Sequence, residues 1–262
     1  MITSGYLDVL DQGLIDATLE RIDLLHDWWI PRGIYCANTG FSPSLENPVD
    51  FYTLGPATYI DCMVNPMTYY AMSKNTNPLL KEYFGWLYDH VVYHLYREIG
   101  PCRLNGTLAY PGFHIFGCKP GEEPKQATKE YMERPSATIH VDLQQEKHLS
   151  YWGKYKDVDL ENCLSFTLCL QVPKTGAGLN TWDDDSVKCY EMNDDYAKGI
   201  KSLEYGAYGK PTVVPYVPGK MFYFIGPLQH QIAPGYNLTL NDRRITLQGH
   251  GVKCDGVWEL YF

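Results

Sequence analysis

The chain has 262 residues, of which 45% are hydrophobic and 20% are charged, the composition of a folded globular protein and not of a disordered one. Its formal net charge is −9, which argues against nucleic acid or an anionic membrane surface as the main partner. No apolar run approaches the roughly 20 residues that a membrane-spanning helix needs, and no secretory signal is recognisable at Met1–Gly5, so we expect a cytoplasmic protein.

Length and cysteine usage both favour a single domain without disulfide bonds. A chain of 262 residues can bury a large core, and β-sandwiches and barrels of this size are commonly one domain. The eight cysteines are scattered and include no Cys-x-x-Cys pair, which a zinc ribbon or a redox dithiol would need. We therefore expect reduced, buried thiols.

The N-terminal part of the sequence, residues 1–102, is predicted to be mainly helical. Apolar residues recur at three- and four-residue steps from Tyr6 to Trp29, which is the stripe of an amphipathic helix. Residues 34–75 are rich in Pro, Asn, Thr and Tyr, and we expect a surface loop there. A second helix is predicted over residues 77–100, opened by an Asn-Pro pair and closed by a Gly-Pro pair.

From residue 103 the pattern changes to short apolar stretches separated by Gly, Pro and Asp, which is typical of β-strands. Strands are predicted at 113–118, 136–143, 164–172, 178–182, 212–216, 220–225, 229–233, 243–248 and 257–262. Many short strands with frequent turns favour two packed sheets of the jelly-roll type, so residues 103–262 are expected to form the core on which residues 1–102 pack. The charged stretch 119–134 interrupts this pattern and is predicted to be a helix or a mobile flap over the mouth of the barrel.

The motif His140-Val141-Asp142 lies in one of these predicted strands. Residues two apart on a strand point to the same face, so a short strand can present an imidazole and a carboxylate to one metal ion. Two histidines and one carboxylate are the ligand set of a mononuclear non-haem iron site that leaves three coordination positions open. A lone His-x-Asp is common, however, and an exposed pair without a metal is the alternative interpretation.

His230 is the candidate for the second histidine. It follows a Pro-Gly turn at 218–219 and an aromatic strand, which would bring it back beside the strand of His140. Because the apolar residues Leu228 and Ile232 flank it, His230 is expected to be partly buried and to need a partner. The alternative is a core histidine that is bonded to a backbone carbonyl.

The motif Arg244-Ile245-Thr246 follows His230 on a further predicted strand. Alternation places Arg244 and Thr246 on one face together with Gln248, and Ile245 on the other. A guanidinium offers a rigid two-pronged fork to a carboxylate, which lysine cannot reproduce, so this face is suited to binding a carboxylate. Arg243 points with the apolar residues and is the weaker candidate, unless a bulge in the strand exchanges the two arginines.

In this order, His140, Asp142, His230 and the Arg244-x-Thr246 motif resemble the Fe(II)- and 2-oxoglutarate-dependent dioxygenases over roughly residues 105–262. The resemblance implies a double-stranded β-helix, a cupin-like jelly roll, with flanking N-terminal helices. It also implies that His140, Asp142 and His230 bind iron and are catalytic, that Arg244 and Thr246 bind 2-oxoglutarate, and that O2 takes the remaining iron position. Related halogenases carry Gly or Ala in place of the carboxylate, so the presence of Asp142 favours hydroxylation or another oxidation.

Three further residues are candidates for substrate binding, each with a structural alternative. His114 lies on the polar face of a predicted strand, near the cosubstrate or the substrate, and a structural histidine is the alternative. Trp182 follows a stretch of small residues and lies either in the pocket or in the core. Asp183 begins a run of three carboxylates, which is either a solvated turn or an anchor for a cationic group such as an amine. Tyr110 and Tyr223 are candidate hydrogen-bond donors to the cosubstrate.

The leading hypothesis is therefore an iron- and 2-oxoglutarate-dependent oxygenase that oxidises a C–H bond of a small molecule, while 2-oxoglutarate is converted to succinate and CO2. The 22 tyrosines suit a pocket with apolar walls and hydrogen-bonding tips, which fits a small polar substrate better than a lipid. An amino acid, an amino-acid derivative or a natural-product intermediate is the expected substrate class. The alternatives are a non-haem iron oxidase that does not use 2-oxoglutarate and a non-catalytic, cupin-like binding protein.

Overall fold

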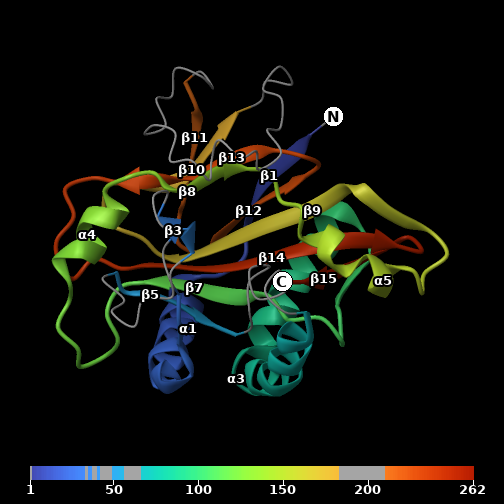
Figure 1. Ribbon diagram of the computed structural model, residues 1–262, viewed down its shortest axis with the longest axis horizontal. Helices are drawn as coiled ribbons and strands as arrows, with labels where there is room; N and C mark the ends of the chain where they lie inside the picture. The colour runs from blue at the N-terminus through green and yellow to red at the C-terminus, as the bar shows by residue number, and fades with distance from the viewer. Residues whose placement is uncertain (1, 33–34, 37–39, 42–48, 56–65, 183–209) are drawn as a thin grey trace.

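The computed structural model describes residues 2–32, 35–36, 40–41, 49–55, 66–182 and 210–262. In these residues two β-sheets lie against each other, and helices cover the outer face of the larger sheet (Figure 1). The protein is therefore mainly β with some helices, as the sequence predicts.

The strands that face the interior form two layers. In the larger sheet the neighbouring strands are β7 (Gly112–Phe116), β14 (Arg244–Cys254), β9 (Val158–Gln171) and β12 (Lys220–Ile225). In the smaller sheet they are β8 (Ser136–His140), β13 (Gln229–Gly235), β10 (Gly176–Trp182) and β11 (Thr212–Pro215). All of these neighbours are antiparallel. Apart from β10 and β11, strands that follow each other along this part of the chain lie in different sheets.

Further strands widen the larger sheet. At one edge β1 (Thr3–Asp8) pairs with β12, and beyond β7 the sheet continues into β5 (Phe51–Leu54) and β2 (Ile30–Pro31). The C-terminal β15 (Val257–Tyr261) returns along β14, and β6 (Cys102–Leu104) runs parallel to β15. A separate ribbon joins β3 (Tyr35–Cys36) and β4 (Gly40–Phe41). The N-terminal part thus supplies strands as well as helices, which its apolar pattern does not predict.

Two helices, α1 (Gln12–Leu24) and α3 (Pro66–Ile99), cover the face of the larger sheet that points away from the smaller one (Figure 1). Apolar side chains of that face, such as Ile115 and Leu247, pack with Leu87 of α3 in the main hydrophobic core. The remaining helices among the described residues are the short α4 (Gln126–Met132) and α5 (Leu149–Trp152) and the 3-10 turns η1 (His26–Trp28) and η2 (Gln144–His148). With one face of the larger sheet packed on helices, the other face borders the space between the sheets.

The predicted helix over residues 6–29 is wrong at its start. Residues 3–8 form β1, which pairs with β12 so that Leu7 lies opposite Met221. The helix begins only after Asp11, whose side chain accepts a hydrogen bond from the backbone N–H of Leu14 at 2.9 Å. Pairing with the edge of β12 and the capping residue together override the helical spacing of the apolar residues.

The second helix is longer than predicted, and the predicted loop over residues 34–75 is correspondingly wrong. The helix α3 begins at Pro66, and β5 also lies in that loop. Pro78 lies inside α3 and not in its first turn. Asn77, the expected capping residue, is buried, and its side chain donates to the carbonyl of Leu108 at 2.8 Å and accepts from the backbone N–H of Tyr110 at 3.0 Å. The Asn-Pro pair therefore holds the connection to β7 and does not start the helix.

The charged stretch 119–134 contains α4, so the predicted helix is confirmed. The buried carboxylate of Asp50 ties this stretch to the N-terminal part of the chain. Lys125 Nζ lies 2.6 Å from Asp50 Oδ1, and the hydroxyl of Thr128 donates to Oδ2 at 3.2 Å. On the inner side, Tyr131 of α4 stacks on Phe116 of β7. The helix is thus anchored beside the sheets by an ion pair with the buried Asp50 and by an aromatic contact.

The strands predicted after residue 103 are all present among the described residues, although their ends differ. The largest differences are at β9, which begins at Val158, and at β14, which continues to Cys254. The strand β8 is shorter than predicted and ends at His140. These ends matter because they decide which side chains the sheets carry into the space between them.

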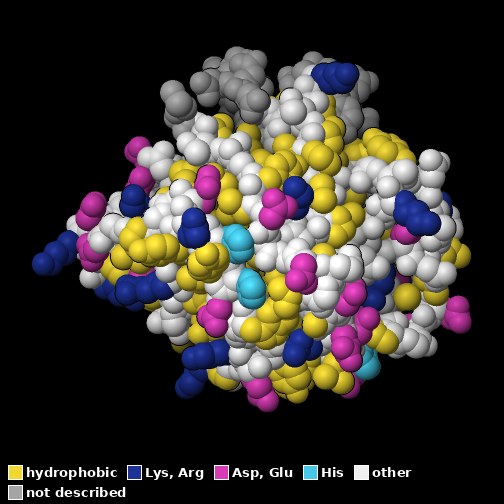
Figure 2. Space-filling view, turned by 180° about the vertical axis from the view of Figure 1, so that it is seen from behind, with side chains coloured by type: hydrophobic (Ala, Val, Ile, Leu, Met, Phe, Trp, Pro, Cys, Tyr) yellow, Lys and Arg dark blue, Asp and Glu magenta, His cyan; other side chains and the backbone are white. Residues whose placement is uncertain are grey.

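The surface carries charges of both signs, and the described thiols are free. On the face shown in Figure 2, acidic and basic side chains are interspersed. Among the described residues, no helix combines the length and the apolar character that crossing a membrane requires. In the described part of the chain, Cys102, Cys169 and Cys254 are buried free thiols, as predicted, whereas the free thiols of Cys118 and Cys163 are only partly buried.

Gly249 is closely packed in the middle of β14. A Cβ atom there would come within 2.5 Å of Phe166 Cζ and 2.9 Å of Pro111 Cγ. We expect Gly249→Ala to lower the free energy of unfolding by about 1–3 kcal/mol, the usual cost of overpacking a dense core. Gly85→Ala in α3 is the matched control, because its new methyl group would have nothing within 4 Å and should stabilise the helix by up to about 1 kcal/mol. Equal effects of the two substitutions in urea denaturation would contradict this expectation.

Candidate metal centre and adjoining cavity

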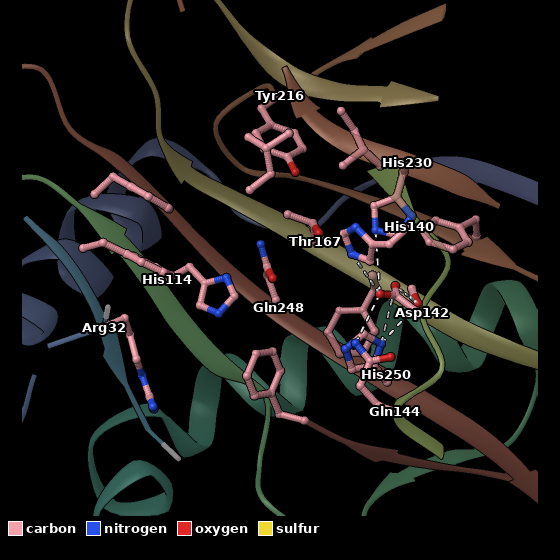
Figure 3. A pocket seen from close by; sticks show the side chains of 18 of the residues that line it. Arg32, His114, His140, Asp142, Gln144, Thr167, Tyr216, His230, Gln248 and His250 are labelled. Atoms are coloured by element: carbon pink, nitrogen blue, oxygen red, sulfur yellow. Dashed lines mark hydrogen bonds and ion pairs between the residues drawn. The ribbon is translucent and has the colours of Figure 1, made fainter. Parts of the chain in front are cut away.

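A cavity lies between the two sheets, and strands of both line it (Figure 3). Polar side chains lie at both of its ends and along the wall between them. His140, Asp142 and His230 lie at one end, and His114 and Arg32 lie at the other. The cavity therefore joins the predicted metal ligands to a second polar region on the larger sheet.

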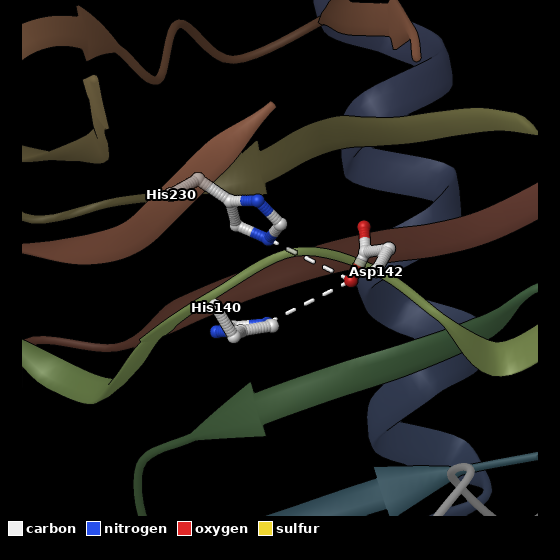
Figure 4. Close-up of side chains that lie close together, drawn as sticks. All are labelled: His140, Asp142 and His230. Atoms are coloured by element: carbon white, nitrogen blue, oxygen red, sulfur yellow. Dashed lines mark ion pairs between the residues drawn. The ribbon is translucent and has the colours of Figure 1, made fainter. Parts of the chain in front are cut away.

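His140 and His230 come from neighbouring strands of the smaller sheet. The antiparallel pairing of β8 with β13 places them directly opposite each other, and their ring centroids lie 4.4 Å apart. Nδ1 of His230 lies 3.0 Å from the carbonyl oxygen of Leu228, a contact in which this nitrogen donates its proton. The donation fixes the ring, and Nε2 is the nitrogen that approaches Asp142 (Figure 4). The hydrogen bond to a backbone carbonyl, which is the alternative to metal binding, therefore uses only Nδ1 of His230 and leaves Nε2 available.

Asp142 reaches the same point from outside the strand. The prediction that the strand extends to residue 143 is wrong, because β8 ends at His140 and Asp142 lies in the connection before η2. Alternation along a strand therefore does not place this carboxylate. Side-chain contacts do: the hydroxyl of Ser165 lies 2.6 Å from Oδ2, and Nε2 of Gln144 lies 3.1 Å from Oδ1.

The three predicted ligands form a site that could hold a metal ion. One ligand atom each from His140, Asp142 and His230 can be chosen so that all lie within 4.8 Å of one another. Asp142 Oδ1 is 3.7 Å from Nε2 of both histidines (Figure 4). Two imidazole nitrogens and one carboxylate oxygen suit non-haem Fe(II), and three protein ligands leave coordination positions for other molecules.

The electrostatics of the site favour an ionised carboxylate. Burial acts to raise the pKa of Asp142, but the nearby histidines and the hydroxyl of Ser165 outweigh it, so the pKa lies below its ordinary value. At His250, burial lowers the pKa, and the negative charge of Asp142 opposes this effect. A deprotonated carboxylate is the state that metal binding requires.

Two residues beside Asp142 were missed by the sequence analysis, Ser165 and His250. The pairing of β9 with β14 places them directly opposite each other. Nδ1 of His250 lies 3.1 Å from Oγ of Ser165 and 3.8 Å from Oδ2 of Asp142. His250 follows Gln248 at a two-residue step along β14, and this continued alternation is the signal that could have identified it.

The two neighbouring arginines at the start of β14 have different partners. Arg243 forms a two-pronged ion pair with Asp23 of α1, with nitrogen-to-oxygen distances of 3.0 and 2.6 Å. Arg244 is 3% exposed, and its guanidinium lies 4.2 Å from the centre of the Phe116 ring. In the described part of the chain, Nη2 of Arg244 has no hydrogen-bond partner. A buried guanidinium nitrogen in that state is costly unless an anion binds it.

Arg244 is not among the residues that line the cavity, but its guanidinium lies over the ring of Phe116, which does line it. Burial lowers the pKa of its guanidinium, and the phenols of Tyr216 and Tyr131 oppose this effect. Both tyrosines line the cavity. Burial also raises the pKa of Tyr216 to about 12, so it is a neutral hydrogen-bond donor at physiological pH. An anion that reaches Arg244 from the cavity would pass these aromatic side chains.

Thr246 and Gln248 follow Arg244 along the same strand. Nε2 of Gln248 donates to Oγ1 of Thr246 at 3.3 Å, which leaves the hydroxyl proton of Thr246 for another acceptor. On the neighbouring strand β7, His114 lies opposite Thr246 and forms a hydrogen bond with Gln248. Gln248 therefore joins Thr246 to His114 in a connected polar row, and Gln248 and His114 both line the cavity (Figure 3).

His114 is a neutral imidazole at the cavity. Its ring lies between the edges of Phe51 and Phe262, at centroid distances of 5.7 and 5.4 Å. Burial and the charges of Arg32 and Arg244 lower the pKa of His114 to about 3, and the bond with Gln248 opposes this effect only in part. Its Nε2 is buried and has no hydrogen-bond partner among the residues that the structure describes.

The other residues named from the sequence either do not line the cavity or lie outside the described residues. Trp182 is buried at the end of β10 and is not among the residues that line the cavity. Asp183 lies outside the described residues. Tyr223 is turned away from the cavity, since its hydroxyl donates to Glu98 of α3 at 2.7 Å, and Tyr110 does not line the cavity. The expectation that Tyr223 donates to a cosubstrate is therefore wrong, and that for Tyr110 stays a prediction.

Arg32 is a cavity residue that the sequence analysis missed. Its side chain is buried, lines the cavity and donates from Nε to the hydroxyl of Thr53 at 2.8 Å. Arg32 directly follows β2, and in the sequence it is far from the other polar residues of the site. Only the pairing of β5 with β7 brings it next to His114.

Comparison with solved structures places this arrangement in a known fold. An N-substituted L-amino acid dioxygenase from Burkholderia ambifaria AMMD superposes with a TM-score of 0.54 at 13% identity, over 99% of this chain and 86% of that chain. The structure of an N-substituted L-amino acid dioxygenase in complex with alpha-KG, from the same organism, gives a TM-score of 0.51 at 12% identity over the same shares. At such identities the likeness shows a shared fold. No family model matches the sequence, and comparison with curated proteins gives no match.

Proposed function

We propose that the protein is an Fe(II)- and 2-oxoglutarate-dependent oxygenase that hydroxylates or otherwise oxidises a C–H bond of a small molecule. The observation that carries this proposal is the convergence of His140, Asp142 and His230 at one end of a cavity, together with the buried guanidinium of Arg244, which packs on the cavity-lining ring of Phe116. A metal ligand set and a buried cation on one cavity match the two ends of 2-oxoglutarate, which are a metal-chelating 2-oxo acid and a distal carboxylate.

The order of the strands supports a double-stranded β-helix. Strands from β7 to β14 alternate between the two sheets except at β10 and β11, so the chain winds around the cavity between the sheets. In this arrangement the first and last strands of the winding, β7 and β14, are neighbours. We propose a single domain in which residues 1–102 pack on the jelly-roll core of residues 103–262.

The donor set fits Fe(II). We propose that His140 and His230 bind it through Nε2 and that Asp142 binds it through Oδ1, the oxygen that approaches both histidines. When bound, Fe(II) with 2-oxoglutarate and O2 supplies the oxidising power that breaks a C–H bond, and the by-products are succinate and CO2. The protein's own residues fix the ligands, keep water from the cavity and orient the target bond.

The distal carboxylate of 2-oxoglutarate is assigned to Arg244 and Thr246. The Nη2 group of Arg244 offers a buried N–H, and the hydroxyl of Thr246 has a proton available because its oxygen already accepts from Gln248. The competing residue Arg243 is held by Asp23. A charge-assisted hydrogen bond in this buried setting would satisfy the guanidinium and anchor the cosubstrate.

The substrate is proposed to carry an N–H or O–H donor, as an amino acid or its N-substituted derivative does. His114 donates from Nδ1 to Gln248, because Nε2 is the nitrogen without a described partner. A neutral imidazole whose one proton is used in this way presents a lone pair on Nε2. The amino acid dioxygenase with a similar fold makes an amine substrate a reasonable first choice for assays.

The cosubstrate assignment can be tested without substrate or oxygen. Adding Fe(II) and 2-oxoglutarate anaerobically should produce the weak visible charge-transfer band of a 2-oxo acid chelated to iron. Arg244→Leu should abolish the band at modest 2-oxoglutarate concentration while iron binding survives, because the anchoring carboxylate contact is lost. Arg243→Leu is the matched control and should keep the band, since Arg243 is paired with Asp23.

Absence of the band in the unmodified protein would overturn the proposed function and leave an iron oxidase without 2-oxoglutarate or a binding protein. Loss of the band in Arg32→Leu, together with its retention in Arg244→Leu, would move the cosubstrate's carboxylate to Arg32, the other cation at the cavity.

The role of His114 can be tested by succinate formation in air across a panel of amino acids and N-substituted amino acids. For an active amine, His114→Phe should raise KM about tenfold or more, because a hydrogen bond to a charged group is worth roughly 1.5–3 kcal/mol. The affinity for 2-oxoglutarate should not change, and an analogue with CH2 in place of the amine should be insensitive to the substitution. A loss of affinity for 2-oxoglutarate instead would place His114 at the cosubstrate.

A further inference from the structure

We propose that Ser165 and His250 are positioning residues that hold Asp142 so that only one of its oxygens can bind the metal ion. The proposal rests on the proposed function, because it assumes that His140, Asp142 and His230 form a metal site. It adds a specific task for two side chains that the metal ligand set does not include.

The hydrogen bonds among Asp142, Ser165 and His250 run in one direction. Oγ of Ser165 lies 2.6 Å from Oδ2 of Asp142 and 3.1 Å from Nδ1 of His250. A hydroxyl has one proton, and a carboxylate can only accept, so Ser165 donates to Asp142. The same oxygen then accepts from His250, which must carry its proton on Nδ1. The three side chains form a directed chain from His250 through Ser165 to Asp142.

The two carboxylate oxygens of Asp142 have different partners. Oδ1 is the oxygen 3.7 Å from Nε2 of both His140 and His230, and it also accepts from Gln144 at 3.1 Å. Oδ2 is turned toward Ser165, and Nδ1 of His250 lies 3.8 Å from it. One oxygen therefore faces the histidine ligands, and the other is engaged by the larger sheet.

The larger sheet fixes Ser165 and His250 relative to each other. Ser165 and His250 are a directly opposed pair on β9 and β14, so the backbone ladder sets the distance between them. The His250 ring stacks on Phe262, with centroids 5.8 Å apart and planes inclined by 26°. Ser165 is only 5% exposed. Buried polar groups of this kind are costly unless they are satisfied, and here the two groups satisfy each other and the carboxylate.

Binding through one oxygen of Asp142 decides how many coordination positions of the metal ion stay open. A carboxylate that binds through both oxygens takes one more coordination position than a carboxylate that binds through one. A site that must accept a chelating 2-oxo acid and O2 needs three open positions beside its three protein ligands. Holding Oδ2 on Ser165 keeps that third position open.

Metal titration of the full chain tests the proposal without relying on activity. Fe(II), added anaerobically, should bind to Ser165→Ala about 10- to 100-fold more weakly than to the unmodified protein, the usual effect of removing a residue that orients a metal ligand. Thr167→Ala, two residues along the same strand, is the matched control and should bind Fe(II) with unchanged affinity.

A spectrum distinguishes positioning from a general loss of structure. With Co(II) in place of Fe(II), Ser165→Ala should shift the visible ligand-field bands, because the second carboxylate oxygen takes a coordination position that a water molecule holds in the unmodified protein. Ser165→Thr, which keeps the hydroxyl, should restore the affinity and the spectrum. His250→Leu should weaken metal binding, and His250→Gln, which keeps an N–H donor, should recover part of the loss.

An unchanged metal affinity and spectrum in folded Ser165→Ala would overturn the proposal. If Ser165→Ala does not fold, the comparison of His250→Leu with His250→Gln decides, and equal affinities in these two variants would overturn it. Failure of the unmodified protein to bind metal would instead refute the proposed function, so the two failures are distinguishable.

Discussion

The candidate site depends on the pairing of β8 with β13, which sets His140 directly opposite His230. Two imidazoles at this separation can share a carboxylate oxygen, and Asp142 provides it at 3.7 Å from each. A buried carboxylate among imidazoles is unfavourable to desolvate unless hydrogen bonds and positive charge compensate for it. The larger sheet supplies the hydrogen bonds through Ser165 and His250. The candidate metal site therefore depends on both sheets, although its three candidate ligands lie in the smaller sheet and in the connection that follows β8.

The cavity extends from this site along the inner face of the larger sheet to His114 and Arg32. The strand β14 carries Arg244, Thr246, Gln248 and His250 toward the cavity region, while Ile245 and Leu247 belong to the core under the helices. One strand thus links the buried guanidinium to the residue that supports the metal ligand. Close packing at Gly249 keeps that strand in register against Phe166. The helices α1 and α3 cover the apolar face of this sheet.

Much of this could be predicted from the sequence, because the decisive signals are local. Alternation identified most strands after residue 103, and the types and order of His140, Asp142, His230 and Arg244 indicated the chemistry. Features that depend on tertiary pairing could not be predicted. The strand at residues 3–8 forms because β12 offers an edge, and Asn77 is used for packing where a cap was expected. The position of Asp142 beyond the end of β8, and the pairing of Ser165 with His250, follow from contacts across the two sheets.

The central claim is that His140, Asp142 and His230 hold iron at one end of the cavity and that Arg244 holds 2-oxoglutarate. The most direct measurement is an anaerobic crystal structure with Fe(II) and 2-oxoglutarate, with the metal located by anomalous scattering at the iron edge. The account predicts an iron peak bonded to the two Nε2 atoms and to Oδ1 of Asp142, with Oδ2 still on Ser165 and the distal carboxylate of 2-oxoglutarate on Arg244. Iron bound elsewhere, or 2-oxoglutarate bound without contact to Arg244, would contradict it.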